Sequence, residues 1–184
     1  MRARGSGFTM IEMMVTIAVL AILLTVGLPA WQTFVQNERL NAIRDNMISA
    51  LGQARGTAVN DDSVVTVCPY SAASGGSCGS SWSAGWIIIE TLGSSSTVLA
   101  RQTLSYTGAP TIGSLATGSA SGTIASVSFN PRPPYVAAAQ SGDFRICDNR
   151  GASYALSFNL QTTGYAQAAA STGYTLAGAA LSCP

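Results

Sequence analysis

The stretch Gly7-Phe8-Thr9-Met10-Ile11-Glu12 opens an apolar run that continues to Leu28. No charged residue lies between Met13 and Leu28, so Glu12 is a single carboxylate at one end of the run. A charged side chain inside a bilayer costs roughly 2.5–3.5 kcal/mol on insertion scales. A carboxylate at this position is therefore expected to have a function and a partner that neutralises it.

Three ordinary kinds of segment compete for this run. A secretory signal peptide has a shorter apolar core, followed by a small-residue cleavage site, and an early glutamate is atypical of it. A plain single-span anchor needs ~20 apolar residues, which Met13–Leu28 with its flanks approaches. A buried core helix is the third alternative. The order Gly-Phe-Thr-x-Ile-Glu, followed by unbroken apolar residues, is typical of none of the three.

The hexapeptide and the apolar run together resemble the N-terminal signal of type IV pilin-like proteins, also called the type III signal sequence. In that family a dedicated peptidase cuts after the glycine, and the new N-terminal residue is methylated. The resemblance implies cleavage between Gly7 and Phe8 and N-methylation of Phe8 by the prepilin peptidase/N-methyltransferase. It also implies that Glu12 is an assembly residue, neutralised by the N-terminal amine of an adjacent subunit.

The composition of this 184-residue chain suits an exported protein with one domain behind an anchor. Removing residues 1–7 takes away Arg2 and Arg4, which leaves 7 Arg against 8 Asp+Glu. A near-neutral chain offers no bulk electrostatic attraction to nucleic acid. The leader arginines mark the cytoplasmic end, so we expect a single-pass inner-membrane protein with a periplasmic head, and later an extracellular pilus subunit.

The four cysteines agree with an oxidising compartment. Cys68 and Cys78 flank a Ser/Gly-rich stretch that a bridge would pin, and a bridge from Cys147 to Cys183 would tie down the C-terminus. Three pairings are possible, and we choose 68–78 with 147–183. With no histidine and no Cys-x-x-Cys pair, no metal site and no cofactor are expected.

The pattern after the apolar run predicts an α+β protein, in which a long helix packs on an antiparallel sheet. The helix is expected from about Phe8 to Ala58, with a kink at Pro29. Its second half is predicted to be amphipathic and half-buried, because apolar residues recur at spacings of three, four or their multiples: Trp31, Phe34, Val35, Ile43, Met47, Leu51, Ala54 and Ala58.

Strands are predicted where β-branched and aromatic residues cluster between turn formers. The expected division is 1–7 leader, 8–29 membrane and filament-core helix, 30–60 amphipathic half of the helix and 61–184 β-rich head. Three stretches are expected as turns: Gly93–Ser96, Gly108–Ser121 and Asn130–Pro134. The expected strands are Val64–Cys68, Gly85–Glu90, Val98–Leu104, Thr123–Phe129, Asp143–Cys147, Ala152–Asn159 and Gly164–Gln167.

Two patterns in the head resemble the FimT/FimU-like (GspH-like) minor pilins. The first is Val67-Cys68-Pro69, Cys78 and Trp82-x3-Trp86; the second is Phe129-Asn130-Pro131 followed by Phe144-x2-Cys147-Asp148-Asn149-Arg150-Gly151. The resemblance implies a FimU-like subunit that primes pilus assembly, connects the tip complex to the fibre and supports twitching motility and adhesion. Its partners would be major and minor pilins. The related H-type pseudopilin of type II secretion generally lacks this cysteine arrangement.

The other functional alternative is DNA binding for natural transformation. FimT-like members carry a Gly-Arg-x-Arg motif, and the matching stretch here, Gly164-Tyr165-Ala166-Gln167, has neither arginine. Phosphate neutralisation by Lys and Arg supplies most non-specific affinity for DNA. Arg132, Arg145 and Arg150 could still form a small patch, but three arginines that solvate a surface are the favoured interpretation. Nucleic acid is therefore a possible partner that we do not favour.

No catalytic residue is predicted. Without histidine, Ser-His-Asp and Cys-His arrangements are impossible. The carboxylate pairs Asp61/Asp62 and Asp143/Asp148 lie beside expected strand ends, where aspartate commonly caps turns. The Gly/Ser runs lack the lysine and following helix of a phosphate loop.

Overall fold

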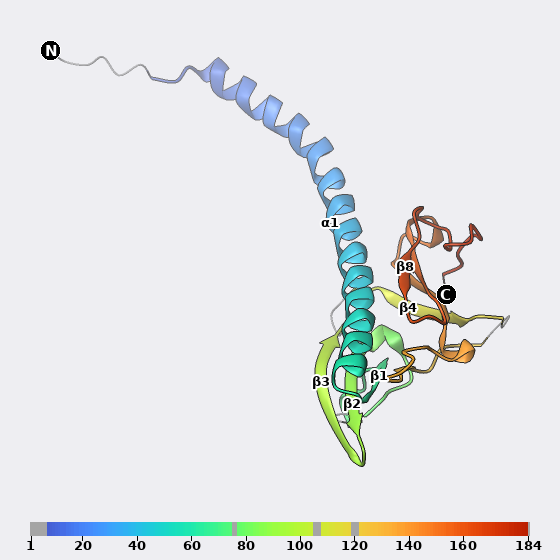
Figure 1. Ribbon diagram of the computed structural model, residues 1–184. Coiled ribbons are helices and arrows are strands. Elements are labelled where there is room, and N and C mark those ends of the chain that lie inside the picture. Colours follow the sequence, from blue (N-terminus) through green and yellow to red (C-terminus); the bar gives the residue numbers. More distant parts are fainter. Residues whose placement is uncertain (1–6, 75–76, 105–107, 119–121, 184) are drawn as a thin grey trace. The chain divides into compact units, whose positions relative to one another are not determined.

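The computed structural model describes residues 7–74, 77–104, 108–118 and 122–183. In these residues one α-helix, α1 (Met10–Asn60), is followed by eight strands and four short 3-10 helices (Figure 1). The chain divides into two compact units, Met1–Arg39 and Leu40–Pro184. The described part of the first unit is almost entirely helix, whereas the second unit contains the rest of α1 and all the strands.

Helix α1 continues through Pro29, although proline cannot donate a backbone hydrogen bond. The Thr33 hydroxyl donates to the Pro29 carbonyl over 3.1 Å. The helix ends at Asn60, two residues beyond the expected end at Ala58 and directly before Asp61-Asp62. Asp62 takes a left-handed conformation, with φ 51°, and the Ser63 N–H donates to the Ala58 carbonyl over 3.2 Å. Aspartate is among the few residues that adopt this conformation routinely, so it suits the position after the last turn.

The first sheet has four antiparallel strands in the order β3-β2-β1-β5. Strands β1 (Val64–Pro69) and β2 (Gly85–Leu92) are its apolar centre, and β3 (Ser95–Thr103) and β5 (Val127–Phe129) are its edges. The second sheet is also antiparallel, in the order β4-β6-β7-β8. Its strands are β4 (Thr111–Ala116), β6 (Gly142–Cys147), β7 (Leu156–Leu160) and β8 (Ala166–Ala168).

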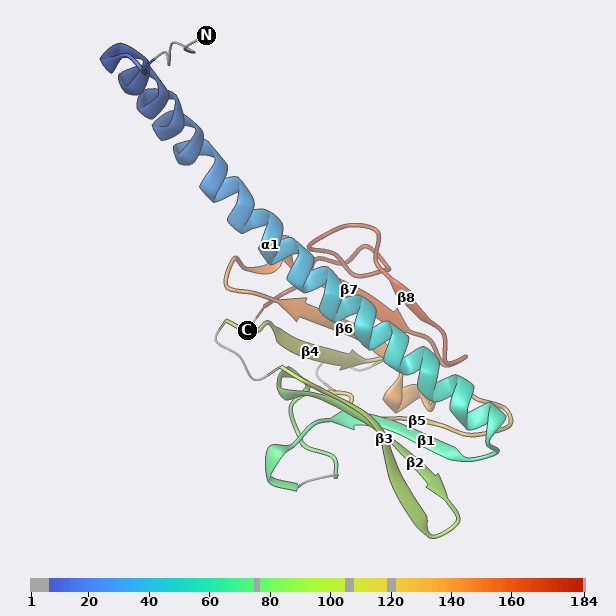
Figure 2. The same ribbon diagram turned by 90° about the vertical axis from the view of Figure 1, so that its left-hand side faces the viewer.

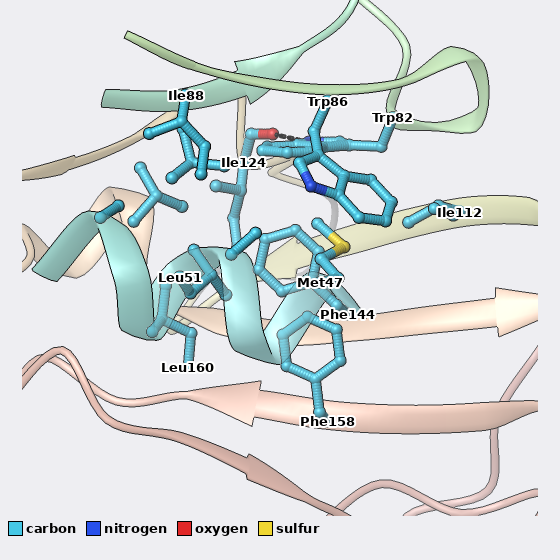
Figure 3. Packing of buried hydrophobic residues seen from close by; sticks show 14 of the residues in the cluster. Met47, Leu51, Trp82, Trp86, Ile88, Ile112, Ile124, Phe144, Phe158 and Leu160 are labelled. Atoms are coloured by element: carbon cyan, nitrogen blue, oxygen red, sulfur yellow. Dashed lines mark hydrogen bonds between the residues drawn. The ribbon is translucent and has the colours of Figure 1, made fainter. Parts of the chain in front are cut away.

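The core of the second unit joins α1 to both sheets (Figures 2 and 3). Met47 and Leu51 of the helix are fully buried and lie close to Phe144 and Leu160 of the second sheet. The Trp82 indole N–H donates to the Ile124 carbonyl over 2.6 Å, so this large ring is buried without an unpaired donor. The buried residues of α1 follow the helical period: Leu40, Ile43, Met47, Ala50, Leu51, Ala54 and Ala58.

The predicted apolar stripe is therefore correct at Val35, which is half-buried, and from Ile43 onward, and it is wrong at Trp31 and Phe34. Trp31 and Phe34 were expected in the half-buried face, but they are 64% and 55% exposed. They lie in the first unit, whose described residues form no strand. Periodicity predicts which residues share a helix face, and it does not predict whether that face has a partner in the chain.

The main error in the strand prediction is β4, which lies inside the stretch expected to be a turn. The glycine and serine residues in this stretch are typical of a loop, but Gly113 and Ser114 both belong to the strand. Gly113 pairs with Arg145 of β6, and a Cβ at Gly113 would lie 2.7 Å from the Arg145 Nε. Ser114 accepts a hydrogen bond from the Ile124 N–H over 3.0 Å. The last three residues of the predicted turn, 119–121, lie outside the described residues.

Three other predicted strands begin later than expected: β5, β7 and β8, the last of which is Ala166–Ala168 instead of Gly164–Gln167. Strand β5 begins at Val127 because the backbone of Ile124 bonds to side chains, those of Trp82 and Ser114, instead of to a neighbouring strand. Strand β7 begins at Leu156 because Ala152–Tyr154 forms a short 3-10 helix. The predicted turn at Gly93–Ser96 is also shorter, since β3 already begins at Ser95.

Two disulfides close loops in the second unit: Cys68–Cys78 and Cys147–Cys183, the pairing chosen from the sequence. The second joins the end of β6 to the C-terminal segment across 36 residues, and the first spans 10. The Arg145 guanidinium also donates to the Ser182 hydroxyl over 2.9 Å, so the C-terminal segment is held at two neighbouring points.

Replacing both Cys147 and Cys183 by serine should lower the free energy of unfolding by about 2–4 kcal/mol, because the unfolded chain gains loop entropy. The matched control replaces Cys68 and Cys78, which close a shorter loop, and its loss should be about 1 kcal/mol smaller on the same model. Chemical denaturation of residues 40–184 would measure both. Equal losses would contradict the dependence on loop length.

Candidate functional site: the N-terminal segment and the arginines

The first turn of α1 is organised by Thr9, which sits immediately before the helix. Its hydroxyl accepts a hydrogen bond from the Glu12 N–H over 3.3 Å, and its carbonyl accepts one from the Met13 N–H over 3.2 Å. Threonine is a favoured N-cap because its side chain satisfies one of the free N–H groups of the first turn. Glu12 lies in that first turn, where the helix dipole favours a negative charge.

The sequence analysis did not predict the N-cap at Thr9, although the sequence contains a pattern that indicates it. Thr9-Met10-Ile11-Glu12 has the Ser/Thr-x-x-Glu spacing of a capping box directly before an apolar run. The same four residues therefore start the helix and place the carboxylate within it.

Gly7 and Phe8 precede the helix and are exposed. Phe8 is 78% exposed, and a Cβ added to Gly7 would meet no atom of the described residues within 4 Å. The packing of the chain therefore does not explain a glycine at position 7 or a phenylalanine at position 8. The expected leader residues 1–6 lie outside the described residues.

The first unit exposes apolar side chains on all sides of α1. Within the described residues, one helix is long and apolar enough to cross a membrane, and no part of its most apolar stretch is buried. A helix that is apolar all round normally lies in lipid or in a core made with other chains. The large exposed apolar residues are Phe8, Met10, Ile11, Met13, Met14, Val15, Ile17, Val19, Leu20, Ile22, Leu23, Leu24, Leu28, Trp31 and Phe34.

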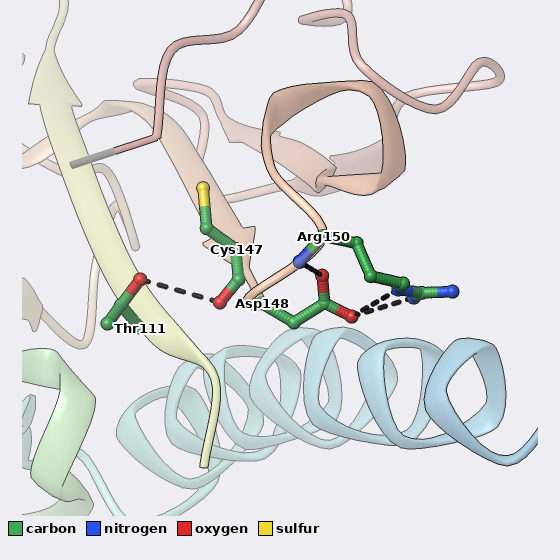
Figure 4. A network of polar contacts seen from close by, with 4 residues as sticks. All are labelled: Thr111, Cys147, Asp148 and Arg150. Atoms are coloured by element: carbon green, nitrogen blue, oxygen red, sulfur yellow. Dashed lines mark hydrogen bonds and ion pairs between the residues drawn. The ribbon is translucent and has the colours of Figure 1, made fainter. Parts of the chain in front are cut away.

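The three arginines considered for DNA contact each bond to a different residue of the second unit. Arg150 forms an ion pair with Asp148 (Figure 4), and the nearer carboxylate oxygen lies 2.7 Å from Nη2. The Arg150 guanidinium also lies 4.5 Å from the Tyr154 ring centre. Arg145 bonds to Ser182.

The remaining arginine, Arg132, is exposed and lies 3.7 Å from an oxygen of Asp62. Two of the three guanidinium groups thus have a carboxylate partner, which reduces the net positive charge that they present. Arg150 is also largely buried, since its side chain is only 14% exposed. These contacts favour structural roles for the arginines over phosphate binding.

The carboxylate pairs and the cysteines also have structural contacts. Asp143 accepts a hydrogen bond from the Asn159 amide over 2.8 Å, and Asp148 accepts one from the Arg150 N–H over 3.0 Å. All four cysteines are in disulfides. No group of three or more Cys, Asp or Glu that could hold a metal ion occurs among the described residues.

Two family profiles match the chain. Residues 2–28 match the prokaryotic N-terminal methylation motif, and residues 44–164 match the family described as Type II transport protein GspH. No curated protein matches. These families are structural proteins of the pilin type, in agreement with the prediction that the chain is not an enzyme.

Two solved structures share the fold, both of the type IV minor pilin FimU from Pseudomonas aeruginosa strain PAO1, in space groups P21 and P65. The first has a TM-score of 0.53 and 18% identity, and the match covers 73% of this chain and 91% of that one. The second has a TM-score of 0.50 and 18% identity, covering 70% and 90%. The expected fold, a long apolar helix packed on antiparallel sheets, is thus confirmed. Because the GspH profile spans well over half of the chain, this protein belongs to the GspH family and carries an N-terminal methylation motif.

Proposed function

We propose that this chain is a minor pilin of the type IV pilus, cut between Gly7 and Phe8 and methylated on Phe8. The observation that carries the proposal is the segment Gly7–Glu12, placed directly before a helix that exposes apolar side chains on every side. Packing of the chain does not require a glycine at position 7 or a phenylalanine at position 8. Recognition by a processing peptidase would account for both residues.

The same segment is suited to two states of the subunit, one in the membrane and one in the pilus. Before assembly, α1 would span the inner membrane with the second unit on the periplasmic side. During assembly, the apolar surface of α1 would exchange lipid for the equivalent surface of neighbouring subunits, so that little apolar area meets water at any stage. The partners would be major and minor pilins, and the prepilin peptidase would act first.

The particular role that we propose is to prime assembly and to connect the tip complex to the fibre, in support of twitching motility and adhesion. The likeness in fold to FimU supports a place among the minor pilins. The tip position, the motility and the adhesion are proposals for this chain, and the DNA-binding role is less favoured because of the arginine contacts described above.

The N-terminus of the native protein tests the proposal directly. Mass spectrometry should find a chain that begins at N-methylated Phe8. Changing Gly7 to a bulky residue should leave the leader attached, whereas the same change at Gly5 in the leader should allow normal cleavage. An intact Met1 in the native protein, or cleavage after α1, would contradict the proposal.

A second candidate, a pseudopilin of type II secretion, is favoured by the description of the matched family as a type II transport protein. Deletion of the chain separates the two functions. A minor pilin should be found in pili sheared from cells, and its loss should reduce piliation. A pseudopilin should be absent from sheared pili, and its loss should reduce protein secretion instead.

The contacts of the arginines predict weak binding to DNA. Residues 40–184 should cause no mobility shift of duplex DNA in the low micromolar range, near the ~10⁻⁶ M limit of non-specific binding. Changing Tyr165 and Gln167 to arginine would restore the Gly-Arg-x-Arg pattern at two exposed positions, one just before β8 and one in the middle of it. This variant should bind DNA more tightly and its binding should depend more steeply on salt. The slope of log binding constant against log salt concentration should steepen by about 0.9 for each new phosphate contact. Tight binding by the unchanged chain would reverse the ranking of the two functions.

A further inference from the structure

An exposed aromatic pair, Trp31 and Phe34, lies on the part of α1 that belongs to the first unit. The two rings are on the same side of the helix because they are three residues apart, and their centres lie 5.9 Å from each other. Trp31 is 64% exposed and Phe34 is 55% exposed. Two large rings left exposed side by side on one helix need a partner outside the described fold.

The position of Trp31 along the helix indicates what that partner is. From Glu12 to Trp31 the helix advances nineteen residues, which is about 29 Å. The hydrocarbon core of a bilayer is about 30 Å thick. When Glu12 lies at one boundary of that core, the indole of Trp31 therefore reaches the other boundary.

The residues that follow Trp31 change from apolar to polar in steps. No charged residue occurs from Met13 to Asn37, and the adjacent Glu38 and Arg39 then cancel in charge. The first polar side chains are Gln32, Thr33 and Gln36, and of these the Thr33 hydroxyl donates to the Pro29 carbonyl. Together with Trp31, Val35 and Arg39, the two glutamines line a shallow hollow on the surface of the helix.

We propose that Trp31 and Phe34 anchor α1 at the periplasmic boundary of a phospholipid bilayer and so set the depth of the helix before assembly. An indole has an apolar body and one N–H donor, which is why tryptophan is enriched at membrane–water boundaries. The amides and the guanidinium beside it are donors for ester and phosphate oxygens. Because Glu38 offsets Arg39, the anchor depends on the rings and not on anionic lipid.

This inference rests on the proposed function, since it requires α1 to span the membrane. It adds a specific consequence, which is that a subunit leaving the bilayer must withdraw two aromatic rings from the boundary. An alternative occupant of the rings is a second copy of the chain, which would shield them from lipid.

Depth-dependent quenching of tryptophan fluorescence tests the inference on the full chain. The chain would be reconstituted in vesicles of phosphatidylethanolamine and phosphatidylglycerol that contain lipids brominated near the headgroup or at the chain ends. The two other tryptophans, Trp82 and Trp86, are 4% and 3% exposed and should not meet lipid. Trp31→Phe therefore gives the background signal, and Leu20→Trp in that variant gives a reference for the centre of the bilayer.

We expect bromine near the headgroup to quench Trp31 more strongly than bromine at the chain ends, with the reverse order for the Leu20→Trp reference. The quenching should be lost in Trp31→Phe. If Trp31 showed the same quenching pattern as the Leu20→Trp reference, the inference would be overturned. It would also be overturned if the chain floated with the vesicles but Trp31 were not quenched, and that result would favour a protein partner. A chain that does not float with vesicles would overturn the membrane span itself, and so the proposed function as well.

Discussion

Glu12→Ala should insert into the inner membrane normally and almost disappear from assembled pili. In the membrane, loss of the carboxylate removes an unfavourable charge from the end of an apolar helix. In a fibre, the proposed partner of Glu12 is the N-terminal amine of Phe8 on a neighbouring subunit. Removing one member of a buried ion pair typically costs about 3–5 kcal/mol, or more than a hundredfold in an equilibrium constant.

The fraction of the chain in sheared pili and in membranes, measured by immunoblotting, reports this effect. Glu38→Ala is the matched control, because Glu38 is also an exposed glutamate of α1 but lies beyond the apolar run. It should enter pili nearly as well as the unchanged chain, since exposed ion pairs contribute little. Equal incorporation of Glu12→Ala and Glu38→Ala would remove the assembly role from Glu12.

The candidate N-terminal site can be recognised in the sequence because its information is local. The hexapeptide Gly7–Glu12 and the apolar run that follows it are contiguous, and charge and polarity alone show how unusual Glu12 is. The cap formed by Thr9 is equally local and follows from its spacing to Glu12. The end of α1 was predictable for the same reason, because Asp61-Asp62 follows the last apolar position.

The parts that could not be predicted depend on contacts between distant residues. The sequence of β4 resembles a loop because it does not reveal that the Arg145 side chain lies against Gly113. Residues 123–126 were predicted as part of a strand, but Ile124 bonds to the side chains of Trp82 and Ser114 instead. Trp31 failed in a different way. Its spacing fits the buried stripe of α1, but the sheets that bury that stripe belong to the unit that begins at Leu40.

The second large effect is expected at the centre of the core, where Phe144 of β6 is fully buried. Its ring stacks on Phe158, with centres 4.9 Å apart, and is perpendicular to the Trp82 ring, with centres 5.4 Å apart. The strand register places Phe144 directly opposite Phe158, so the stacked pair joins β6 to β7. Such pairs contribute about 0.5–1.5 kcal/mol beyond the area that they bury.

Phe144→Ala should therefore lower the free energy of unfolding of residues 40–184 by about 3–5 kcal/mol, a large part of the 5–15 kcal/mol typical of a domain. Phe144→Leu keeps most of the volume and should lose about 1–2 kcal/mol, mainly the ring contacts. Denaturation by guanidinium, with Tyr165→Ala as the exposed control, would measure these losses. The control should change stability by less than about 0.5 kcal/mol.

A loss below about 1 kcal/mol for Phe144→Ala would mean that the core closes around the missing ring. In that case the two sheets would be held mainly by α1, through residues such as Met47 and Leu51, and not by the aromatic cluster. Met47→Ala would then have the larger effect, which the same denaturation experiment would show. The order of these two variants thus distinguishes a core built around the rings of the sheets from one built around the helix.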